Sequence, residues 1–407
     1  MTGAPGDNTV VGALLLAGLV AGHAAIALGF LSRVHAIGLN PRWMQRIPAL
    51  PLLPPALIAA WLAWLASTRP VGLWPAEARA YGVLCNVIAW IVVPAAIVMR
   101  SFRKPPAGVR VRDEPLPLDP TPGGLDTWIG EGKDAWMLRL PGNESLTLRA
   151  TSCELALAGL PHGFGSLRVL HLSDFHFGRC YDRRYFEAVA EAASGWAADL
   201  VVFTGDLLDD EATLDWTVPV FRRLRGRLGQ FAILGNHDFA HRPGRIRRAL
   251  RSAGFAMLDG RWRLVEDGRR TIALGGTSAP WGPSLVPSGR PEADATIVLS
   301  HAPDEFPRVA SWGTVDVVLA GHNHGGQIRL PCVGPLVMPS RYGLRYDQGI
   351  FRRGRTLMEV TRGVGGKHPL RYGCPPEIVR LTLRPAHAVM SPLSSRPRRI
   401  SDSTSRT

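Results

Sequence analysis

Residues 315–327 read VDVVLAGHNHGGQ, and this stretch decides the fold class. Its first half, rich in β-branched valine, is typical of a buried strand, and it stops abruptly at a polar cluster that holds two histidines. Four earlier stretches follow the same plan, in which an apolar run leads into a polar cluster: Arg168–Leu172 into SDFHFG, Leu200–Phe203 into TGDLLDD, Phe231–Leu234 into GNHDFA and Thr296–Leu299 into SHAPDE.

Helix-like stretches separate several of these strands, for example Arg183–Ala198 and Pro243–Ala253. Buried strands that alternate with loops and helices predict an α/β layered fold. In such sheets ligands gather at the carboxyl ends of the strands, and every polar cluster falls at such an end. The sequence therefore predicts one site to which five loops contribute.

The five loops present carboxylate, imidazole and amide groups: Asp174, His176, Asp206, Asn236, His237, Asp238, His301, His322 and His324. Carboxylate and imidazole together bind divalent Mn, Fe, Zn or Co. No cysteine joins the group, which argues against a structural zinc site. Asp-x-His and His-x-His spacings place alternate side chains on one side of an extended loop, so both can reach one ion. The set exceeds what one ion needs, so we expect two divalent ions that share a carboxylate.

Each motif taken singly has a plainer explanation. A G-D pair after a strand is mostly turn chemistry, and His301 alone is more often a hydrogen-bonded histidine than a ligand. Glycines 205, 235 and 321 directly precede three of the clusters, where the missing Cβ permits tight turns and close approach of the backbone to metal or substrate. Five motifs in this order, each closing an apolar strand, favour a metal site.

The order D-x-H, G-D, G-N-H-D, H and G-H-x-H resembles the calcineurin-like metallophosphoesterases over about Leu167 to Leu383. GHNHGGQIRLP, VTRGVG and PLRYGCPPEIVRLTL resemble the bacterial branch of that family, which carries amino-terminal membrane helices. Two positions depart from the family pattern: Phe175 stands where leucine is usual, and Asn323 stands where threonine is usual. Neither position supplies a ligand in the family.

The resemblance implies a layered fold of two packed sheets flanked by helices, and a two-metal site with one shared carboxylate. The first metal would be held by Asp174, His176 and His324, the second by Asn236, His301 and His322, and the bridge would be Asp206. A bridging water, made acidic by both ions, would become the hydroxide that attacks phosphorus. His237 would stabilise the phosphoryl oxygens or protonate the leaving alkoxide, with Asp238 orienting its ring.

Three amino-terminal stretches have the length and composition of membrane spans: Val10–Leu31, Ile47–Ala66 and Tyr81–Met99. The alternatives are a cleaved signal peptide or buried core helices. Residues 1–9 contain no Lys or Arg, and three such segments are too many for a signal peptide. The second stretch is the weakest of the three, because its prolines shorten any helix there. We expect residues 1–100 to form a membrane unit of about three transmembrane helices.

Basic residues flank these stretches unevenly. Arginines 33, 42 and 46 follow the first stretch, and Arg100, Arg103, Lys104, Arg110 and Arg112 follow the third. The second connection holds only Arg69 and Arg79, offset by Glu77. The positive-inside rule then predicts a multi-pass protein of the inner cell membrane with its large domain in the cytoplasm.

The remainder of the chain divides by composition. Residues 101–145 read as a Pro- and Arg-rich linker and lead-in, and within them residues 101 to about 124 read as a linker rather than packed structure. Residues 146–386 read as the metallophosphoesterase domain and residues 387–407 as a disordered tail. Five cysteines without CxxC spacing indicate neither a disulfide framework nor a thiolate zinc site.

The predicted function is metal-dependent hydrolysis of a phosphodiester or phosphomonoester near the membrane surface, on a lipid-linked or nucleotide-linked substrate. The formal net charge of +14 favours anionic partners such as phosphate esters, acidic lipid or nucleic acid, without choosing among them. A nuclease or cyclic-nucleotide phosphodiesterase of the same fold is the alternative enzyme, and a non-catalytic scaffold is the alternative outside enzymes. Beyond the substrate and the lipid bilayer, the sequence indicates no specific nucleic-acid or protein partner.

Overall fold

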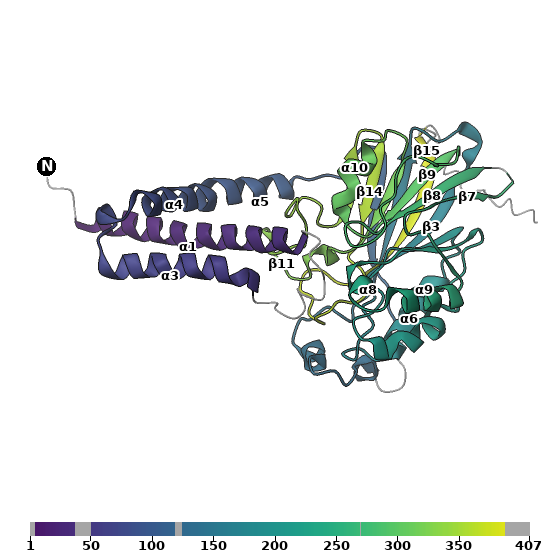
Figure 1. Cartoon of the computed structure of the whole chain (residues 1–407), viewed down its shortest axis with the longest axis horizontal. Coiled ribbons are helices and arrows are strands. Elements are labelled where there is room, and N and C mark those ends of the chain that lie inside the picture. Colours follow the sequence, from purple (N-terminus) through teal and green to yellow (C-terminus); the bar gives the residue numbers. More distant parts are fainter. Residues whose placement is uncertain (1–4, 37–49, 119–123, 269, 387–407) are drawn as a thin grey trace, which may run out of the picture.

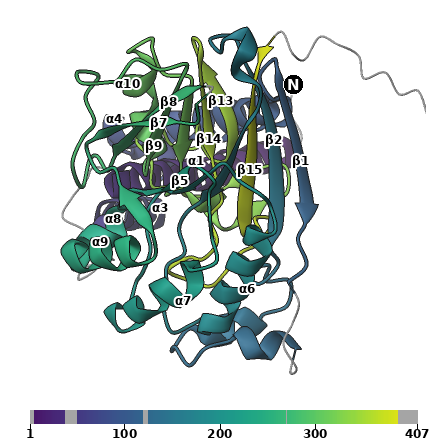
Figure 2. The ribbon, with the colours of Figure 1, turned by 90° about the vertical axis from the view of Figure 1, so that its right-hand side faces the viewer.

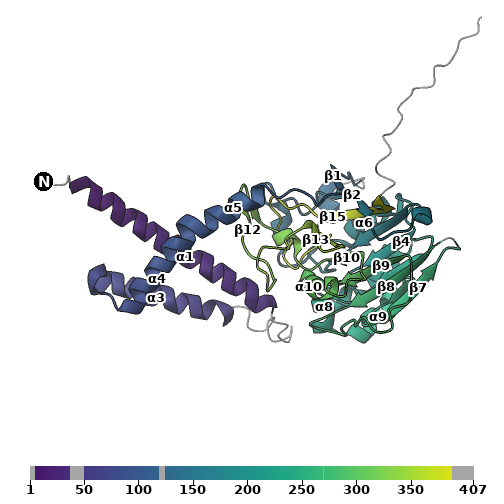
Figure 3. The same ribbon diagram turned by 90° about the horizontal axis from the view of Figure 1, so that it is seen from above.

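The computed structural model describes residues 5–36, 50–118, 124–268 and 270–386. An elongated helical unit projects from one side of an α/β body (Figure 1). Seen from above, the helices of this unit cross one another and meet the body at one end only (Figure 3). The predicted tail, residues 387–407, lies outside the described residues.

The helical unit contains α1 (Pro5–Ala36), α3 (Leu53–Thr68), α4 (Ala76–Val87) and α5 (Val93–Ser101), with a π-helical turn at Ile88–Val92. Three of its stretches are long and apolar enough to span a membrane: Val10–Val34, Leu50–Thr68 and Ala76–Ser101. The expected apolar helices are therefore confirmed, although the start of the second expected stretch, residues 47–49, lies outside the described residues. Pro94 interrupts the third stretch without ending it, since the wider π-helical turn precedes it.

Helices α1 and α4 pack closely through a small-xxx-small motif, Gly18 and Gly22. A Cβ added at Gly22 would lie 2.0 Å from the carbonyl oxygen of Cys85, so only glycine permits this approach. Two polar contacts join the same helices: His23 Nδ1 lies 2.7 Å from the Tyr81 hydroxyl, and Asn86 Nδ2 donates to the Leu15 carbonyl at 3.2 Å. Such contacts satisfy polar groups that lipid would leave unpaired.

The body contains two large sheets. The first has seven strands in the order β1 (Val109–Pro115), β2 (Arg149–Leu157), β15 (Glu377–Pro385), β3 (Leu167–Leu172), β4 (Leu200–Phe203), β5 (Gly229–Ala232) and β6 (Phe255–Met257). The second has six, in the order β13 (Gly349–Arg353), β14 (Thr356–Val360), β10 (Val317–Ala320), β9 (Ala295–Ser300), β8 (Thr271–Thr277) and β7 (Trp262–Glu266). Strands β11 (Arg329–Leu330) and β12 (Gly334–Pro335) form a small separate pair.

Parallel pairing brings the carboxyl ends of the central strands together. Strands β3 to β6 are parallel neighbours in the first sheet, and β8, β9, β10 and β14 are parallel neighbours in the second. Side chains from the facing sheets form one apolar core, which includes Val169 and Val202 from the first sheet and Ile297 and Leu319 from the second. The expected α/β architecture with two packed sheets is therefore confirmed.

Helices cover the outer faces of this sandwich. Helices α6 (Arg183–Ser194), α7 (Thr217–Phe221) and α9 (Pro243–Ser252) lie on one side of the strands, and α10 (Phe306–Ala310) lies on another (Figure 2). Phe175 fills the core under α6 and α7, where it is fully buried and its ring lies 4.9–5.9 Å from four other phenylalanine rings: Phe177, Phe186, Phe203 and Phe221. The aromatic cluster explains why a phenylalanine fits where the family pattern has leucine.

The expectation that residues 101 to about 124 form only an unpacked linker is wrong in part. Residues Val109–Pro115 form β1, an edge strand paired antiparallel with β2 from Val109↔Leu155 to Pro115↔Arg149. The alternating pattern VRVRDE suits an exposed edge strand, but the prolines on either side of it favoured a linker instead. Trp128 and Leu138, farther along the lead-in, are buried in the core of the body.

Candidate metal centre

The five polar loops lie close together, where the carboxyl ends of the parallel strands of both sheets meet. Asp174 and His176 follow β3, Asp206 follows β4, Asn236 opens the short helix α8 (Asn236–Ala240) after β5, His301 follows β9, and His322 and His324 follow β10. The first three loops come from one sheet and the last two from the other. The structure therefore brings together all seven residues that the sequence nominated as ligands.

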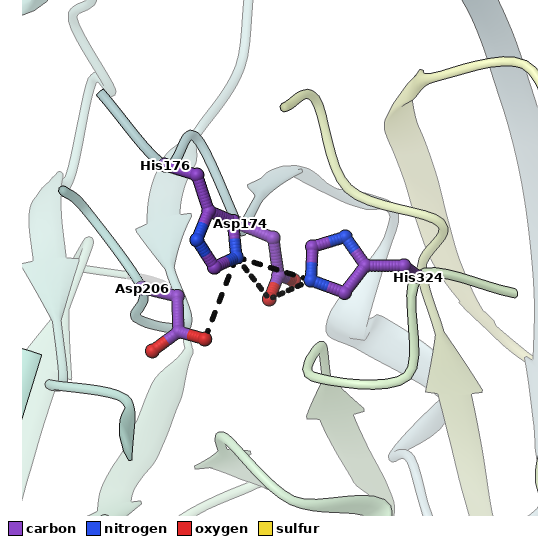
Figure 4. Close-up of side chains that lie close together, drawn as sticks. All are labelled: Asp174, His176, Asp206 and His324. Atoms are coloured by element: carbon purple, nitrogen blue, oxygen red, sulfur yellow. Dashed lines mark hydrogen bonds and ion pairs between the residues drawn. The ribbon is translucent and has the colours of Figure 1, made fainter. Parts of the chain in front are cut away.

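One cluster contains Asp174, His176, Asp206 and His324 (Figure 4). The Nε2 atoms of His176 and His324 face each other at 3.0 Å, and Asp174 Oδ1 lies 3.5 Å from His324 Nε2 and 3.9 Å from His176 Nε2. Ligand atoms that share one ion at about 2.1 Å lie about 3 Å apart when they are at right angles. The side chains are therefore spaced as ligands of a single ion.

A second cluster contains Asp206, His301 and His322. His301 Nε2 lies 3.3 Å from Asp206 Oδ2 and 2.9 Å from the amide oxygen of Asn236. The His301 and His322 rings are 5.0 Å apart at their centroids, and Trp281 packs against His322 at 4.8 Å. Trp281 was not expected from the sequence, because nothing in SAPWGPS indicates which loop reaches the site.

Asp206 belongs to both clusters. Its Oδ2 atom lies 3.5 Å from His176 Nε2 in the first cluster and 3.3 Å from His301 Nε2 in the second. Its other oxygen, Oδ1, accepts a hydrogen bond from the backbone N–H of His237 at 2.9 Å, which fixes the orientation of the carboxylate. The Oδ2 atom thus lies close to a ring nitrogen of each cluster.

The backbone is strained at these loops. Asp174, His176, Asp206, His322 and His324 all have φ between 48° and 68°, a region that non-glycine residues rarely adopt. Only two other non-glycine residues of the described chain, Gln327 and Cys332, share this feature. Such strain costs of the order of 1–3 kcal/mol per residue and clusters at functional sites. Its concentration on five of the seven nominated ligands marks this site as functional.

Glycines allow the loops to approach one another. A Cβ on Gly235 would lie 2.2 Å from Asp206 Oδ1, and one on Gly321 would lie 2.4 Å from Asp174 Oδ2. Gly205 in addition adopts a φ of +101°. Glycine therefore lets neighbouring loops of the site pack together, and a left-handed turn is present at Gly205.

Hydrogen bonds orient three of the imidazole rings. His176 Nδ1 donates to Asp209 Oδ2 at 3.0 Å, His301 Nδ1 donates to the Thr204 carbonyl at 2.7 Å, and His322 Nε2 donates to the Pro339 carbonyl at 3.0 Å. Because each of these nitrogens carries a hydrogen, the other nitrogen of each ring is the one that can bind a metal ion. Such partners fix the tautomer and orientation of metal-binding histidines.

Burial shapes the charges of the site. Asp174 and Asp206 are almost fully buried, which costs free energy unless cations compensate their charge. Burial acts to raise the pKa of Asp206, but the charges on His301, His237 and His176 together outweigh it and hold that pKa well below its usual range. Burial, followed by the charge on His301, lowers the pKa of His322 to about 3, so His322 is neutral and has a lone pair to share.

His237 lies beside the first cluster. Its ring is 4.6 Å from that of His176, and its Nδ1 lies 2.5 Å from Asp209 Oδ1. Burial acts to lower the pKa of His237, but the carboxylates of Asp209 and Asp206 outweigh it and raise the pKa to about 9. The ring is therefore protonated at neutral pH and able to donate a proton or a hydrogen bond.

The expectation that Asp238 orients the His237 ring is wrong, because Asp209 contacts that ring. The Asp238 carboxylate instead accepts three backbone N–H bonds, from Asp206, Leu207 and Gly235, each at 2.9 Å. Asp238 thereby ties the loop after β4 to the loop after β5. Asp209, the fifth residue of GDLLD in the loop after β4, was not expected from the sequence to contact a histidine of the site.

Comparisons with known proteins agree with this geometry. The family model described as calcineurin-like phosphoesterase matches residues 167–326. The chain is 31% identical to the uncharacterized metallophosphoesterase YkuE of Bacillus subtilis, covering 55% of this chain and 82% of the relative. It is also 31% identical to the phosphodiesterase YaeI of Escherichia coli, over 53% of this chain and 82% of the relative.

A third relative is the UDP-2,3-diacylglucosamine pyrophosphatase LpxG of Chlamydia trachomatis, which is 26% identical over 52% of this chain and 82% of the relative. Members of this family depend on two metal ions. Both clusters offer carboxylate and imidazole groups, and the second also offers the amide oxygen of Asn236. Such donors suit divalent cations. The protein belongs to the calcineurin-like metallophosphoesterases and is a phosphoester hydrolase.

Proposed function

We propose that this protein hydrolyses a phosphodiester or phosphomonoester, lipid-linked or nucleotide-linked, at the surface of the membrane that holds its amino-terminal helices. Asp174, His176 and His324 would hold one divalent ion, and Asn236, His301 and His322 the other. The observation that carries the proposal is the position of Asp206 Oδ2, within 3.5 Å of a ring nitrogen in each cluster. A shared oxygen of this kind suits two ions about 3.5–4 Å apart.

When bound, the two ions would supply a water-derived nucleophile at neutral pH and would neutralise charge on the phosphoryl group. The protein contributes rigidity, because Asp209, Thr204 and Pro339 hold three ligand rings before substrate arrives. Preorganised groups of this kind need not reorient during the reaction.

His237 is the proposed proton donor. Asp209 accepts from its Nδ1, which leaves Nε2–H to bond a phosphoryl oxygen or to protonate the departing alkoxide. Asp238 has a different part in this proposal: its bonds to the Asp206, Leu207 and Gly235 amides hold the bridging carboxylate and the His237 loop in register. Its effect on the reaction is therefore indirect.

The helical unit supports a multi-pass arrangement with the catalytic body in the cytoplasm. Helix α1 runs toward the body, α3 runs away from it, and α4 and α5 return to it (Figures 1 and 3). Arg33, Arg100, Arg103 and Lys104 thus lie at the body end, whereas Arg69 and Arg79 lie near the far end. The positive-inside rule assigns the richer end to the cytoplasm.

The membrane unit and the relative LpxG, named for a lipid-linked pyrophosphate, together favour a lipid-linked substrate. The relative YaeI is named a phosphodiesterase, which makes a simpler phosphodiester the second candidate substrate. Among the described residues no nominated ligand is missing, which argues against a non-catalytic scaffold.

A substrate screen on the detergent-solubilised full-length protein with Mn²⁺ tests the proposal. We expect Mn²⁺-dependent release of phosphate or of a phosphorylated product from lipid phosphoesters, and slower turnover of a chromogenic phosphodiester. Efficient cleavage of single-stranded nucleic acid or of cyclic nucleotides, with lipid esters untouched, would instead identify the nuclease or cyclic-nucleotide phosphodiesterase. No turnover of any ester at saturating Mn²⁺ would contradict the proposed hydrolysis.

A further inference from the structure

One segment of the body joins the helical unit to the metal centre. Residues 331–348, here called the docking segment, follow the His322–His324 loop and β11. Met338, at the centre of this segment, is fully buried, although much of the segment's surface is exposed. The segment has one set of contacts with the helices and another with the candidate ligands.

Three side chains hold the docking segment. Two belong to the helical unit, and the third follows directly after it. The Ser32 hydroxyl of α1, itself buried, accepts from the Met338 backbone N–H at 3.2 Å. Arg100 at the end of α5 donates to the Val333 and Leu344 carbonyls at 3.3 and 3.2 Å, and so ties together two separate parts of the segment.

Arg103 adds an ion pair at the end of the segment. Its guanidinium lies 2.6 Å from Asp347 Oδ1 and also donates to the Gln348 carbonyl at 2.9 Å. Asp347 is fully buried and also pairs with Arg329. Arg329 lies three residues after Gly326, which follows the loop that carries His322 and His324. Asp347 resists movement away from either arginine, because weaker pairing of a buried charge costs free energy.

The docking segment also contacts the loop that carries His322 and His324. The Pro339 carbonyl, one residue after Met338, accepts from His322 Nε2 at 3.0 Å. The Tyr346 carbonyl accepts from Asn323 Nδ2 at 2.7 Å. A carbonyl can only accept, so Pro339 keeps the hydrogen of His322 on Nε2 and leaves the lone pair on Nδ1.

We propose that Ser32, Arg100 and Arg103 are positioning residues of the metal centre: they hold the docking segment so that Pro339 orients His322. The metal site is then built jointly by the helical unit and the catalytic body. Only one peptide bond separates the residue that contacts Ser32 from the residue that contacts His322. The inference rests on the proposed role of His322 as a ligand.

The test compares Mn²⁺ binding to full-length variants in detergent by calorimetry. Removing an orienting partner of a metal ligand typically weakens metal affinity about 10–100-fold. We expect the double variant Arg100→Ala/Arg103→Ala to lose about that much affinity at one of two sites and to keep the other. Turnover should recover toward the wild-type kcat at saturating Mn²⁺, which general loss of structure would not allow.

Ser32→Ala is the milder variant, in case the double variant does not fold. It should weaken the same site to a smaller extent, and Ser32→Thr, which keeps the hydroxyl, should restore it. Ser67→Ala is the matched control, because among the described residues the Ser67 hydroxyl bonds only the Trp64 carbonyl of its own helix. Arg79→Ala controls for loss of an exposed arginine. Both controls should bind two ions with wild-type affinity.

His322→Ala separates the two proposals. If it loses one ion while Ser32→Ala and the double arginine variant bind both ions normally, the positioning role is wrong and the ligand assignment stands. If His322→Ala itself binds two ions with wild-type affinity, the ligand assignment under the proposed function is wrong, and the positioning inference fails with it. Equal loss at both sites in the Ser32 and arginine variants would also overturn the positioning role.

Discussion

Replacing Asp209 with asparagine removes one acceptor that serves two histidines. Asp209 Oδ1 accepts from His237 and Oδ2 accepts from His176, at 2.5 and 3.0 Å. An asparagine has a single acceptor oxygen, and its NH₂ group would face an N–H of the second ring. At least one ring therefore loses its partner, and both lose the neighbouring negative charge.

The size of the effect follows from the hydrogen bonds. A hydrogen bond to a charged group contributes about 1.5–3 kcal/mol, and about 1.4 kcal/mol corresponds to a factor of ten. Loss at His176 should therefore weaken the ion at the first cluster about 10–100-fold. Loss at His237 should lower kcat about 100-fold even at saturating metal, because the positive charge on that ring depends on Asp209.

The assay is Mn²⁺-dependent hydrolysis of a chromogenic phosphodiester, with kcat measured over a wide range of Mn²⁺. Asp210→Asn is the matched control, since the Asp210 carboxylate bonds Arg179 and the Ala212 N–H at the surface rather than a histidine of the site. Wild-type metal affinity and kcat in Asp209→Asn would refute the reasoning for both rings. Full recovery of kcat at high Mn²⁺ would refute it for His237 alone.

Three further predictions follow from the same structure. His237→Ala should lower kcat about 10²–10⁴-fold while the chain still binds two ions by elemental analysis, and loss of an ion would instead make His237 a ligand. For each site loaded with Mn²⁺ at about 100 times its Kd, chelation of the metal should lower the Tm by about 5–10 °C. Added Mn²⁺ should restore the Tm. An unchanged Tm would mean that the folded protein binds no ion. Phe221→Ala in the buried aromatic cluster should cost about 3–5 kcal/mol, seen as a lower Tm, whereas Val218→Ala on the exposed side of the same helix should change stability by less than about 0.5 kcal/mol.

Much of the body could be predicted from the sequence, because local pattern and global fold agree there. Leu200–Phe203 was expected as a strand and is one, and the other four strands differ from expectation by two residues or fewer at each end. Each nominated ligand follows a strand whose carboxyl end meets the others through parallel pairing. A polar cluster at the end of a buried strand is therefore informative about spatial convergence.

Contacts between distant segments could not be predicted. Asp209 and Asp238 are both aspartates near the site, and only the folded loops reveal that Asp209 meets His237 while Asp238 meets backbone amides. Strand β1 was missed because its alternation is short and flanked by prolines. The contact between Ser32 and Met338 joins residues 306 positions apart, and no local pattern encodes it.

The central claim is that seven separated side chains surround two ions bridged by Asp206. Anomalous diffraction from Mn²⁺-loaded crystals of the full-length protein measures this directly. We expect two anomalous peaks about 3.5–4 Å apart, each bonded to Asp206. One should lie among Asp174, His176 and His324, and the other among Asn236, His301 and His322. A single peak, or two peaks of which one lies outside these side chains, would contradict it.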